Sequence, residues 1–231
     1  MNKPINTTPA PSLLSCLAPY GIGAAFVACL IFFLVFPNLD IDISAYFYDN
    51  GFYWNDNLLI RAIYWFFAKI HALILLVLIA LCIYYAKKHR RNDKLAAVFL
   101  LSSLILGPGI LVNLVLKDNS LGRPRPVHVQ EFGGDANYSK PLYYSGECKR
   151  NCSFVSGHAS IGFYLMALYW INRKKRWLIG GIALGLAIGL TRIMQGGHFF
   201  SDVILAGWAV YFVCVGLDKL ILNRRSHTAS N

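Results

Sequence analysis

The sequence predicts an all-α membrane protein with six transmembrane helices. This prediction rests on composition, on apolar stretches of membrane length and on the placement of the basic residues. The chain has 231 residues, of which 56% are apolar and 14% are charged, and its mean hydropathy is +0.48. Because a soluble domain averages about a quarter charged residues, this composition excludes an ordinary cytoplasmic enzyme and also a disordered or fibrous chain.

Six stretches approach the roughly 20 apolar residues that a helix needs to cross about 30 Å of hydrocarbon. They cover residues 17–36, 64–86, 95–116, 154–171, 177–194 and 201–221. The first stretch could be a cleaved signal, or part of a lipoprotein box ending at Cys16. However, it follows a polar lead with prolines and ends without a small-x-small cleavage site. We therefore expect a span there. Since no repeat or linker interrupts the chain, we also expect a single domain over residues 1–231.

The charge pattern predicts the orientation of these spans. Lysine and arginine outnumber aspartate and glutamate by 22 to 11, which gives a net charge of +11. Two loops carry Lys87, Lys88, Arg90, Arg91 and Lys94, and Arg173, Lys174, Lys175 and Arg176. Cytoplasmic loops show this excess, so the charge indicates topology rather than nucleic-acid binding. An even number of spans then places both termini, with Lys3 at one end and Arg224 and Arg225 at the other, in the cytoplasm.

The two long outer segments, residues 37–63 and 117–153, face the periplasm if the chain is a bacterial inner-membrane protein. Residues 37–63 mix aromatic side chains with the acids Asp40, Asp42, Asp49 and Asp56. Such a mixture is typical of a segment in the lipid headgroup zone.

The segment 117–153 begins with a first cluster of cations, Lys117, Arg123 and Arg125, with Pro124 and Pro126 beside the arginines. A basic loop that binds lipid headgroups is one interpretation. A phosphate site is the other, because guanidinium groups bind phosphate oxygens in pairs and lysine adds a point charge.

A second cluster, Ser156-Gly157-His158, lies at the start of the fourth stretch. It offers a hydroxyl group, outward backbone amides and a titratable imidazole. A capping histidine at a helix end is the alternative.

A third cluster, Arg192, His198 and Asp202, lies between the fifth and sixth stretches. His198 and Asp202 are four residues apart, so on a helix the carboxylate can hydrogen-bond the imidazole, as a nucleophilic or general-base histidine requires. A local capping pair is the alternative, but a carboxylate at the edge of an apolar span is a functional candidate. The pair Gly196-Gly197 allows a tight turn between the arginine and the histidine. The predicted topology places all three clusters on the same outer face.

Together these residues resemble the type 2 phosphatidic acid phosphatase superfamily, membrane lipid phosphatases related in fold to vanadium haloperoxidases. Its first motif is Lys, six residues, Arg-Pro, whereas here Arg123 follows Lys117 after five residues and Arg125 after seven. Arg125 is our first choice for the family's arginine and Arg123 the second. The second motif has Val155 in place of proline, and the third has Thr191 in place of serine.

The resemblance implies a helical core of the phosphatase/haloperoxidase type and a reaction without metal or cofactor. His198 would attack phosphorus, Asp202 would orient it, and His158 would protonate the leaving group. Lys117, Arg125 and Arg192, with Ser156 and the amide of Gly157, would hold the phosphoryl oxygens. The partners implied are a lipid phosphate and the bilayer.

The stretch around Cys148 and Cys152 is similar to the bacterial branch that includes lipid A phosphatases. Phosphatidylglycerophosphate and undecaprenyl diphosphate are alternative substrates. A non-catalytic lipid-binding protein and a transporter are alternatives of other classes. On an oxidising side of the membrane, Cys148 and Cys152 can form a disulfide, and two free thiols are the alternative.

Overall fold

The computed structural model describes residues 13–222, with side chains from residue 21 onward. Lys3, Arg224 and Arg225, whose charges entered the prediction of cytoplasmic termini, lie outside this range. The chain divides into two compact units, residues 1–36 and 37–231. The described residues contain helices and loops but no β-strand, apart from one isolated bridge between Val129 and Ala136. An all-helical architecture is therefore confirmed for the described part of the chain.

The first unit contributes α1 (Leu13–Val35). The second unit contains α2 (Leu39–Ala45), η1 (Tyr53–Asp56), α3 (Leu58–Lys87), α4 (Arg91–Leu104), η2 (Ile105–Lys117), η3 (Pro126–His128), η4 (Gln130–Phe132), α5 (Gly157–Phe163), η5 (Tyr164–Met166), α6 (Ala167–Asn172), α7 (Lys175–Met194), α8 (Phe200–Leu217) and η6 (Asp218–Leu222). The segments η2 and η6 are π-helical and continue α4 and α8, whereas the other η segments are short 3₁₀ turns.

Four helices of the described chain are long and apolar enough to cross a membrane. They are α3, α4 with η2, α7, and α8 with η6, and they correspond to the predicted stretches 64–86, 95–116, 177–194 and 201–221. The count reaches five if Gly21–Val35 and α2 together form one broken span.

The predicted span 154–171 is shorter than expected. The structure places α5, η5 and α6 end to end over residues 157–172, and sixteen helical residues rise only about 24 Å, less than the roughly 30 Å of hydrocarbon. Residues 151–156, immediately before α5, form no helix. Within residues 13–222, the structure therefore has four helices of membrane length, or five with the broken pair, rather than the six expected.

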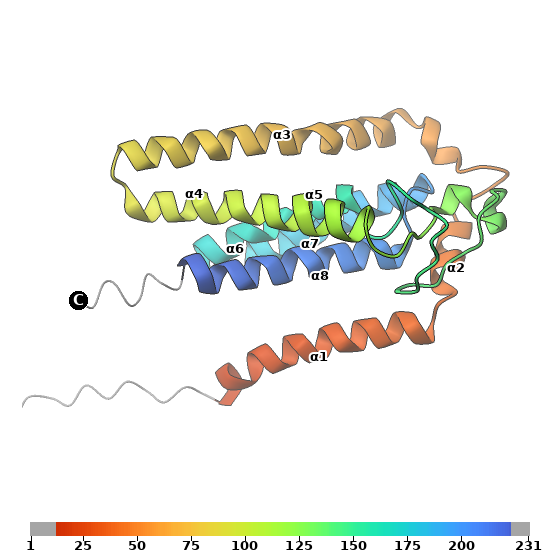
Figure 1. The fold of residues 1–231 in the computed structure, drawn as a ribbon, viewed down its shortest axis with the longest axis horizontal. Helices are drawn as coiled ribbons and strands as arrows, with labels where there is room; N and C mark the ends of the chain where they lie inside the picture. Colours follow the sequence, from red (N-terminus) through yellow and green to blue (C-terminus); the bar gives the residue numbers. More distant parts are fainter. Residues whose placement is uncertain (1–12, 223–231) are drawn as a thin grey trace, which may run out of the picture. The chain divides into compact units, whose positions relative to one another are not determined.

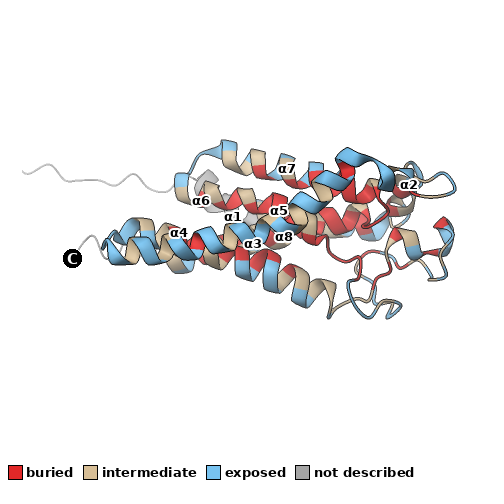
Figure 2. Ribbon diagram, turned by 90° about the horizontal axis from the view of Figure 1, so that it is seen from above, coloured by how far each residue is buried: buried red, intermediate tan, exposed pale blue. Residues whose placement is uncertain are grey.

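Within the second unit, α3, α4, α5, α7 and α8 run side by side (Figure 1). Helix α5 packs against α7 and α8. A β-carbon on Gly185 of α7 would come within 2.3 Å of the Phe163 ring, so glycine permits this close approach. Buried residues concentrate on α5 and α8, whereas α3 is largely exposed (Figure 2). The apolar window of α3 is 6% buried and that of α8 56%, so α3 is the helix with most of its apolar surface left for lipid.

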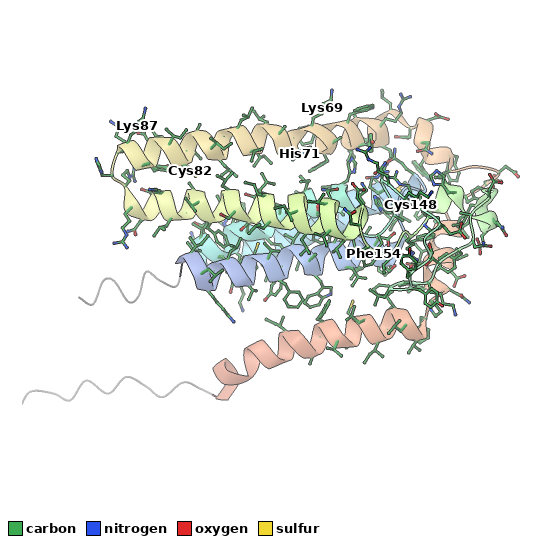
Figure 3. The ribbon with its side chains drawn as sticks, viewed as in Figure 1. Lys69, His71, Cys82, Lys87, Cys148 and Phe154 are labelled. Atoms are coloured by element: carbon green, nitrogen blue, oxygen red, sulfur yellow. A yellow bond between two sulfur atoms is a disulfide. The ribbon has the colours of Figure 1, made fainter. Side chains whose placement is uncertain are left out.

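The two ends of this bundle differ in composition. Lys87 and Cys148 lie at opposite ends (Figure 3). The end with Lys87 carries the short basic turn between α3 and α4, and the end with Cys148 carries α2, the 3₁₀ turns η1, η3 and η4, and the loop 118–156. The π-helical segment η2 runs to this second end, where it places Lys117. Inside η2, the side-chain amide of Asn113 donates to the carbonyl oxygen of Pro108 at 2.6 Å.

Candidate active site

His198 lies in the turn between α7 and α8, and its side chain is 1% exposed. Its Nδ1 atom is 2.6 Å from the carbonyl oxygen of Ser153. A carbonyl oxygen only accepts hydrogen bonds, so Nδ1 carries the proton and Nε2 carries the lone pair. Nε2 is buried and has no hydrogen-bond partner. A buried lone pair without a partner is unusual in a folded protein, and a bound ligand or a reacting atom can satisfy it.

The electrostatic surroundings keep His198 neutral. Burial lowers the pKa of His198 well below its ordinary value of 6.5, and the positive charges of Lys117, Arg192 and Arg125 lower it further. These cations come from the first and third clusters, which the structure brings together around one imidazole. At neutral pH the site therefore combines a neutral imidazole nitrogen that has a free lone pair with three cations, an arrangement suited to an anionic ligand.

Asp202 does not bond His198 directly, contrary to our expectation from their spacing. Its carboxylate accepts hydrogen bonds from the guanidinium of Arg123 at 2.7 Å, from Ser153 Oγ at 2.6 Å and from the backbone N–H of Phe199 at 2.9 Å. The physical reason is its place in the first turn of α8, where a carboxylate folds back onto the amide that precedes the helix. Asp202 thus fixes Ser153, whose carbonyl oxygen in turn holds His198.

Arg123 is a buried structural cation. Its side chain is 0% exposed and forms ion pairs with Asp202 at 2.7 Å and Asp40 at 2.8 Å. Its Nε donates to the carbonyl oxygen of Ser139, and its guanidinium lies 4.2 Å from the centroid of the Phe199 ring. All three of its nitrogens are therefore engaged within the protein, and Arg123 does not line either cavity described below.

Asp40 corrects a second expectation. The composition of residues 37–63 predicted a headgroup-zone acid, whereas Asp40 is 1% exposed. Besides Arg123, it accepts hydrogen bonds from the backbone N–H and the hydroxyl of Ser201. A sequence pattern could not reveal the burial of Asp40, because the residues that it bonds, Arg123 and Ser201, lie far away along the chain.

Arg125, the arginine that we favoured from the sequence, faces the site. Asn151 holds its guanidinium through the backbone oxygen at 3.0 Å and the side-chain oxygen at 2.7 Å. The backbone N–H of Asn151 donates to Asp118. Asn151 belongs to the short loop that the disulfide between Cys148 and Cys152 closes. This loop therefore fixes the orientation of Arg125.

Arg192 lies in the last turn of α7 and is 6% exposed. Its Nη1 donates to the side-chain oxygen of Gln195, while its Nε is buried without a partner. A β-carbon on Gly197 would lie 2.2 Å from Nη2 of Arg192, and one on Gly196, whose φ is +63°, would lie 2.5 Å from the Phe52 ring. Both glycines are therefore required for the turn that brings Arg192 close to His198.

The second cluster places His158 at the start of α5. Ser156 precedes this helix and accepts a hydrogen bond from the backbone N–H of Ala159 at 3.4 Å, and its hydroxyl keeps a hydrogen to donate. Nε2 of His158 is buried without a partner. The His158 ring stacks on Tyr64 of α3, with centroids 4.6 Å apart. Tyr64 belongs to none of the three clusters, and sequence reasoning missed it.

Two cavities border these residues. The first, which we call the arginine cavity, has a volume of about 390 Å³. Its walls are Asn55, Arg61, Tyr64, Trp65, Arg125, Val127, Arg192, Gln195 and Gly197. The second, which we call the apolar cavity, has a volume of about 370 Å³. Its walls are Phe67, Ala68, His71, Leu75, Leu104, Ile105, Pro108, Gly109, Ile110, Asn113, Lys117, Gly157, His158 and Ile161.

The residues that line the two cavities differ in chemistry. The arginine cavity gathers guanidinium groups and suits an anion. The apolar cavity joins the polar ends of Lys117 and His158 to hydrocarbon side chains of α3 and η2, as an amphipathic ligand requires. Over residues 21–222, no group of three or more histidine, cysteine, aspartate or glutamate side chains is arranged to hold a metal ion.

The sequence of this chain is similar to those of known phosphatases. Residues 96–225 match the model of the PAP2 superfamily. The chain is 39% identical to the lipid A 4'-phosphatase of Francisella tularensis subsp. novicida (strain U112), over 84% of this chain and 93% of that protein. It is 38% identical to the lipid A 4'-phosphatase of Rhizobium leguminosarum, over 47% of each chain. It is also 31% identical to the lipid A 1-phosphatase of Rhizobium etli, over 52% of this chain and 53% of that protein. No solved structure matches the chain.

Proposed function

Since the chain belongs to the PAP2 superfamily and is a phosphatase, we propose that it removes a phosphate group from lipid A through a phosphohistidine on His198. One observation carries this proposal: the unpartnered Nε2 of a neutral, buried imidazole lies among three cations. A phosphate monoester supplies the anion that these cations attract and the phosphorus that Nε2 attacks.

The similar proteins favour the 4' position of lipid A. The match to the Francisella 4'-phosphatase extends over nearly the whole of that protein, whereas the match to the 1-phosphatase covers about half of each chain. The apolar cavity supports a lipid substrate, because an acyl chain can lie against its walls while the phosphate reaches the cations. We propose that the lipid enters laterally from the bilayer beside α3.

In the first step of the proposed mechanism, Nε2 of His198 forms a bond to phosphorus and the bond from phosphorus to the lipid oxygen breaks. His158 gives its proton to the leaving oxygen. Lys117, Arg125 and Arg192 stabilise the charge on the equatorial oxygens. The hydroxyl of Ser156 and the amide of Gly157 donate to the same oxygens.

In the second step, His158 takes a proton from water. The water oxygen attacks phosphorus, the bond from phosphorus to Nε2 breaks, and inorganic phosphate leaves. Asp202 acts throughout as a positioning group, because it fixes Ser153 and, through its carbonyl oxygen, the proton on Nδ1 of His198.

We further propose six spans, with the chain in the inner membrane, both termini in the cytoplasm and the site on the periplasmic side. In this topology α1 and the helical segment α5–η5–α6 cross the membrane in addition to the four long helices. The short α5–α6 unit is largely buried among its neighbours, so it needs less contact with lipid than a peripheral span. Cysteine accessibility to a membrane-impermeant reagent at Asn137 and at His89, each replaced by cysteine, tests the two sides.

The experiment that tests the function is phosphate release by detergent-purified protein, with EDTA present. The substrates are lipid A, phosphatidylglycerophosphate and undecaprenyl diphosphate. We expect release from lipid A that vanishes in His198→Asn, because the phosphohistidine cannot form. His89→Asn is the matched control, since His89 is exposed, lies at the opposite end of α3, and has a φ of +53° that asparagine tolerates. Turnover retained in His198→Asn would contradict the proposal that His198 is the nucleophile. Faster release from another substrate would contradict the proposal that lipid A is the substrate.

A further inference from the structure

Tyr64 of α3 contacts two residues of the site although it belongs to no motif. Its ring is stacked on the His158 ring at a centroid distance of 4.6 Å and an interplanar angle of 22°. The guanidinium carbon of Arg192 lies 4.7 Å from the centroid of the same ring. One aromatic ring thus touches a residue of the second cluster and a residue of the third.

The position of Tyr64 differs from that of its neighbours on α3. Trp65 and Phe66 are 55% and 57% exposed, as expected on a lipid-facing helix. Tyr64 is half-buried and lines the arginine cavity. Ala68 and His71 follow it on the same helical face and line the apolar cavity. In Figure 3, His71 lies on the side of α3 that faces the bundle, and Lys69 lies on the opposite side.

The His158 ring has little else to fix its orientation. Nε2 has no hydrogen-bond partner, and the rest of the imidazole makes no hydrogen bond within residues 21–222. A proton donor must present its proton along the line to the leaving oxygen, and a small misplacement lowers the rate steeply. Contact with an aromatic face holds the ring plane, and the same face attracts the Arg192 cation.

We propose that Tyr64 is a positioning residue, whose ring holds His158 in line with the leaving oxygen and Arg192 against the phosphate. This inference rests on the proposed function, because the role of His158 as proton donor comes from it. The ring, not the hydroxyl, performs this task, since both contacts are made with the ring.

The proposal predicts a dependence on the leaving group. Lipid A releases a sugar alkoxide, which needs a proton from His158, whereas p-nitrophenyl phosphate releases a stable anion that needs none. Loss of the Tyr64 ring therefore affects kcat for lipid A more than kcat for p-nitrophenyl phosphate. General acid catalysis contributes about 10²- to 10⁴-fold, so partial loss of it is measurable.

The experiment compares Tyr64→Leu, Tyr64→Phe and the wild type on both substrates. We expect Tyr64→Leu to lower kcat on lipid A by about 10²-fold and the ratio of the two activities by at least about tenfold. Tyr64→Phe, which keeps the ring, should stay within about threefold of the wild type. If Tyr64→Leu does not fold, Tyr64→Met also removes the ring but leaves a flexible side chain that adapts to the gap. Tyr84→Leu is the matched control, because Tyr84 lies on the same helix, is 51% exposed and contacts Tyr85.

A second comparison tests the link to His158. In a His158→Asn background, Tyr64→Leu should cause no further change in the ratio, because the proton donor is already absent. An equal loss on both substrates in the Tyr64→Leu protein would overturn the proposal in favour of a structural role. A Tyr64→Phe protein as impaired as Tyr64→Leu would overturn it in favour of the hydroxyl. A wild-type protein that releases phosphate from neither substrate would instead overturn the proposed function, and with it this inference.

Discussion

Replacement of Arg123 by glutamine distinguishes the role of Arg123 from that of Arg125, the other arginine of the first cluster. Arg123 is 0% exposed and pairs with Asp202 and Asp40 at 2.7 and 2.8 Å. Its removal leaves two carboxylates buried without a counter-charge. Breaking a buried ion pair by removing one partner costs about 3–5 kcal/mol of unfolding free energy. For a chain of this size, that loss corresponds to a fall in Tm of roughly 6–20 °C.

The assay is thermal unfolding in detergent, followed by tryptophan fluorescence, with phosphate release measured in parallel. Arg125→Gln is the matched comparison, since Arg125 faces the arginine cavity and is held by Asn151. We expect Arg125→Gln to keep its Tm within about 2 °C, as at a site without buried ion pairs, and to lose about 10²-fold in phosphate release.

The double variant Arg123→Gln with Asp40→Asn provides a further check. It removes one of the stranded carboxylates, so it should recover at least about 1 kcal/mol of the loss. The reasoning is refuted if Arg123→Gln keeps the wild-type Tm and loses only activity, because Arg123 would then be a phosphate ligand rather than a structural cation.

Three further predictions concern the turn before His198, the protonation of His198 and the disulfide loop. Gly197→Ala should lower kcat/KM for phosphate release by about 10²-fold, because the new β-carbon would lie 2.2 Å from a guanidinium nitrogen of Arg192 and displace it. The acid limb of kcat/KM, corrected for the substrate's own ionisation, should lie below pH 6.5, because the lowered pKa of His198 keeps its imidazole neutral as the pH falls through that value. Cys152→Ser should raise KM about tenfold while kcat changes less, since the open loop holds Arg125 less firmly.

Each of these predictions has a control or a contrary outcome. Gly216→Ala, where a β-carbon meets nothing within 4 Å, should leave kcat/KM unchanged. An acid limb at or above pH 6.5 would contradict a neutral His198. Identical KM values for Cys152→Ser and for the wild type would show that the loop holds Arg125 without the disulfide.

Local patterns predict much of this fold. Apolar runs and loop charges are properties of short stretches, and they predict α3, α4 with η2, α7 and α8. The segment α5–α6 begins at Gly157, later than the expected start at residue 154, because the residues just before it form no helix. Hydropathy does not separate a buried central helix from a lipid-facing one of similar composition.

The site is predicted less completely, because several of its contacts are made between distant parts of the chain. Spacing alone does not distinguish Arg123 from Arg125, and burial and hydrogen-bond partners do. Asp202 and His198 have the spacing of a helical pair, but the first turn of α8 directs the carboxylate to its own N-terminal amide. Tyr64 carries no signal at all in the sequence, since it is one aromatic residue among several on an apolar helix.

The disulfide between Cys148 and Cys152 has a consequence for how the protein matures. Asn151, which it encloses, supplies two of the contacts that hold Arg125. Thiols stay reduced in the cytosol and become oxidised outside it. In the topology proposed above, a newly made chain whose loop 117–153 has not yet crossed the membrane lacks the disulfide that holds Asn151 against Arg125. In that topology the disulfide, and with it the firm hold on Arg125, forms only when the loop reaches an oxidising compartment.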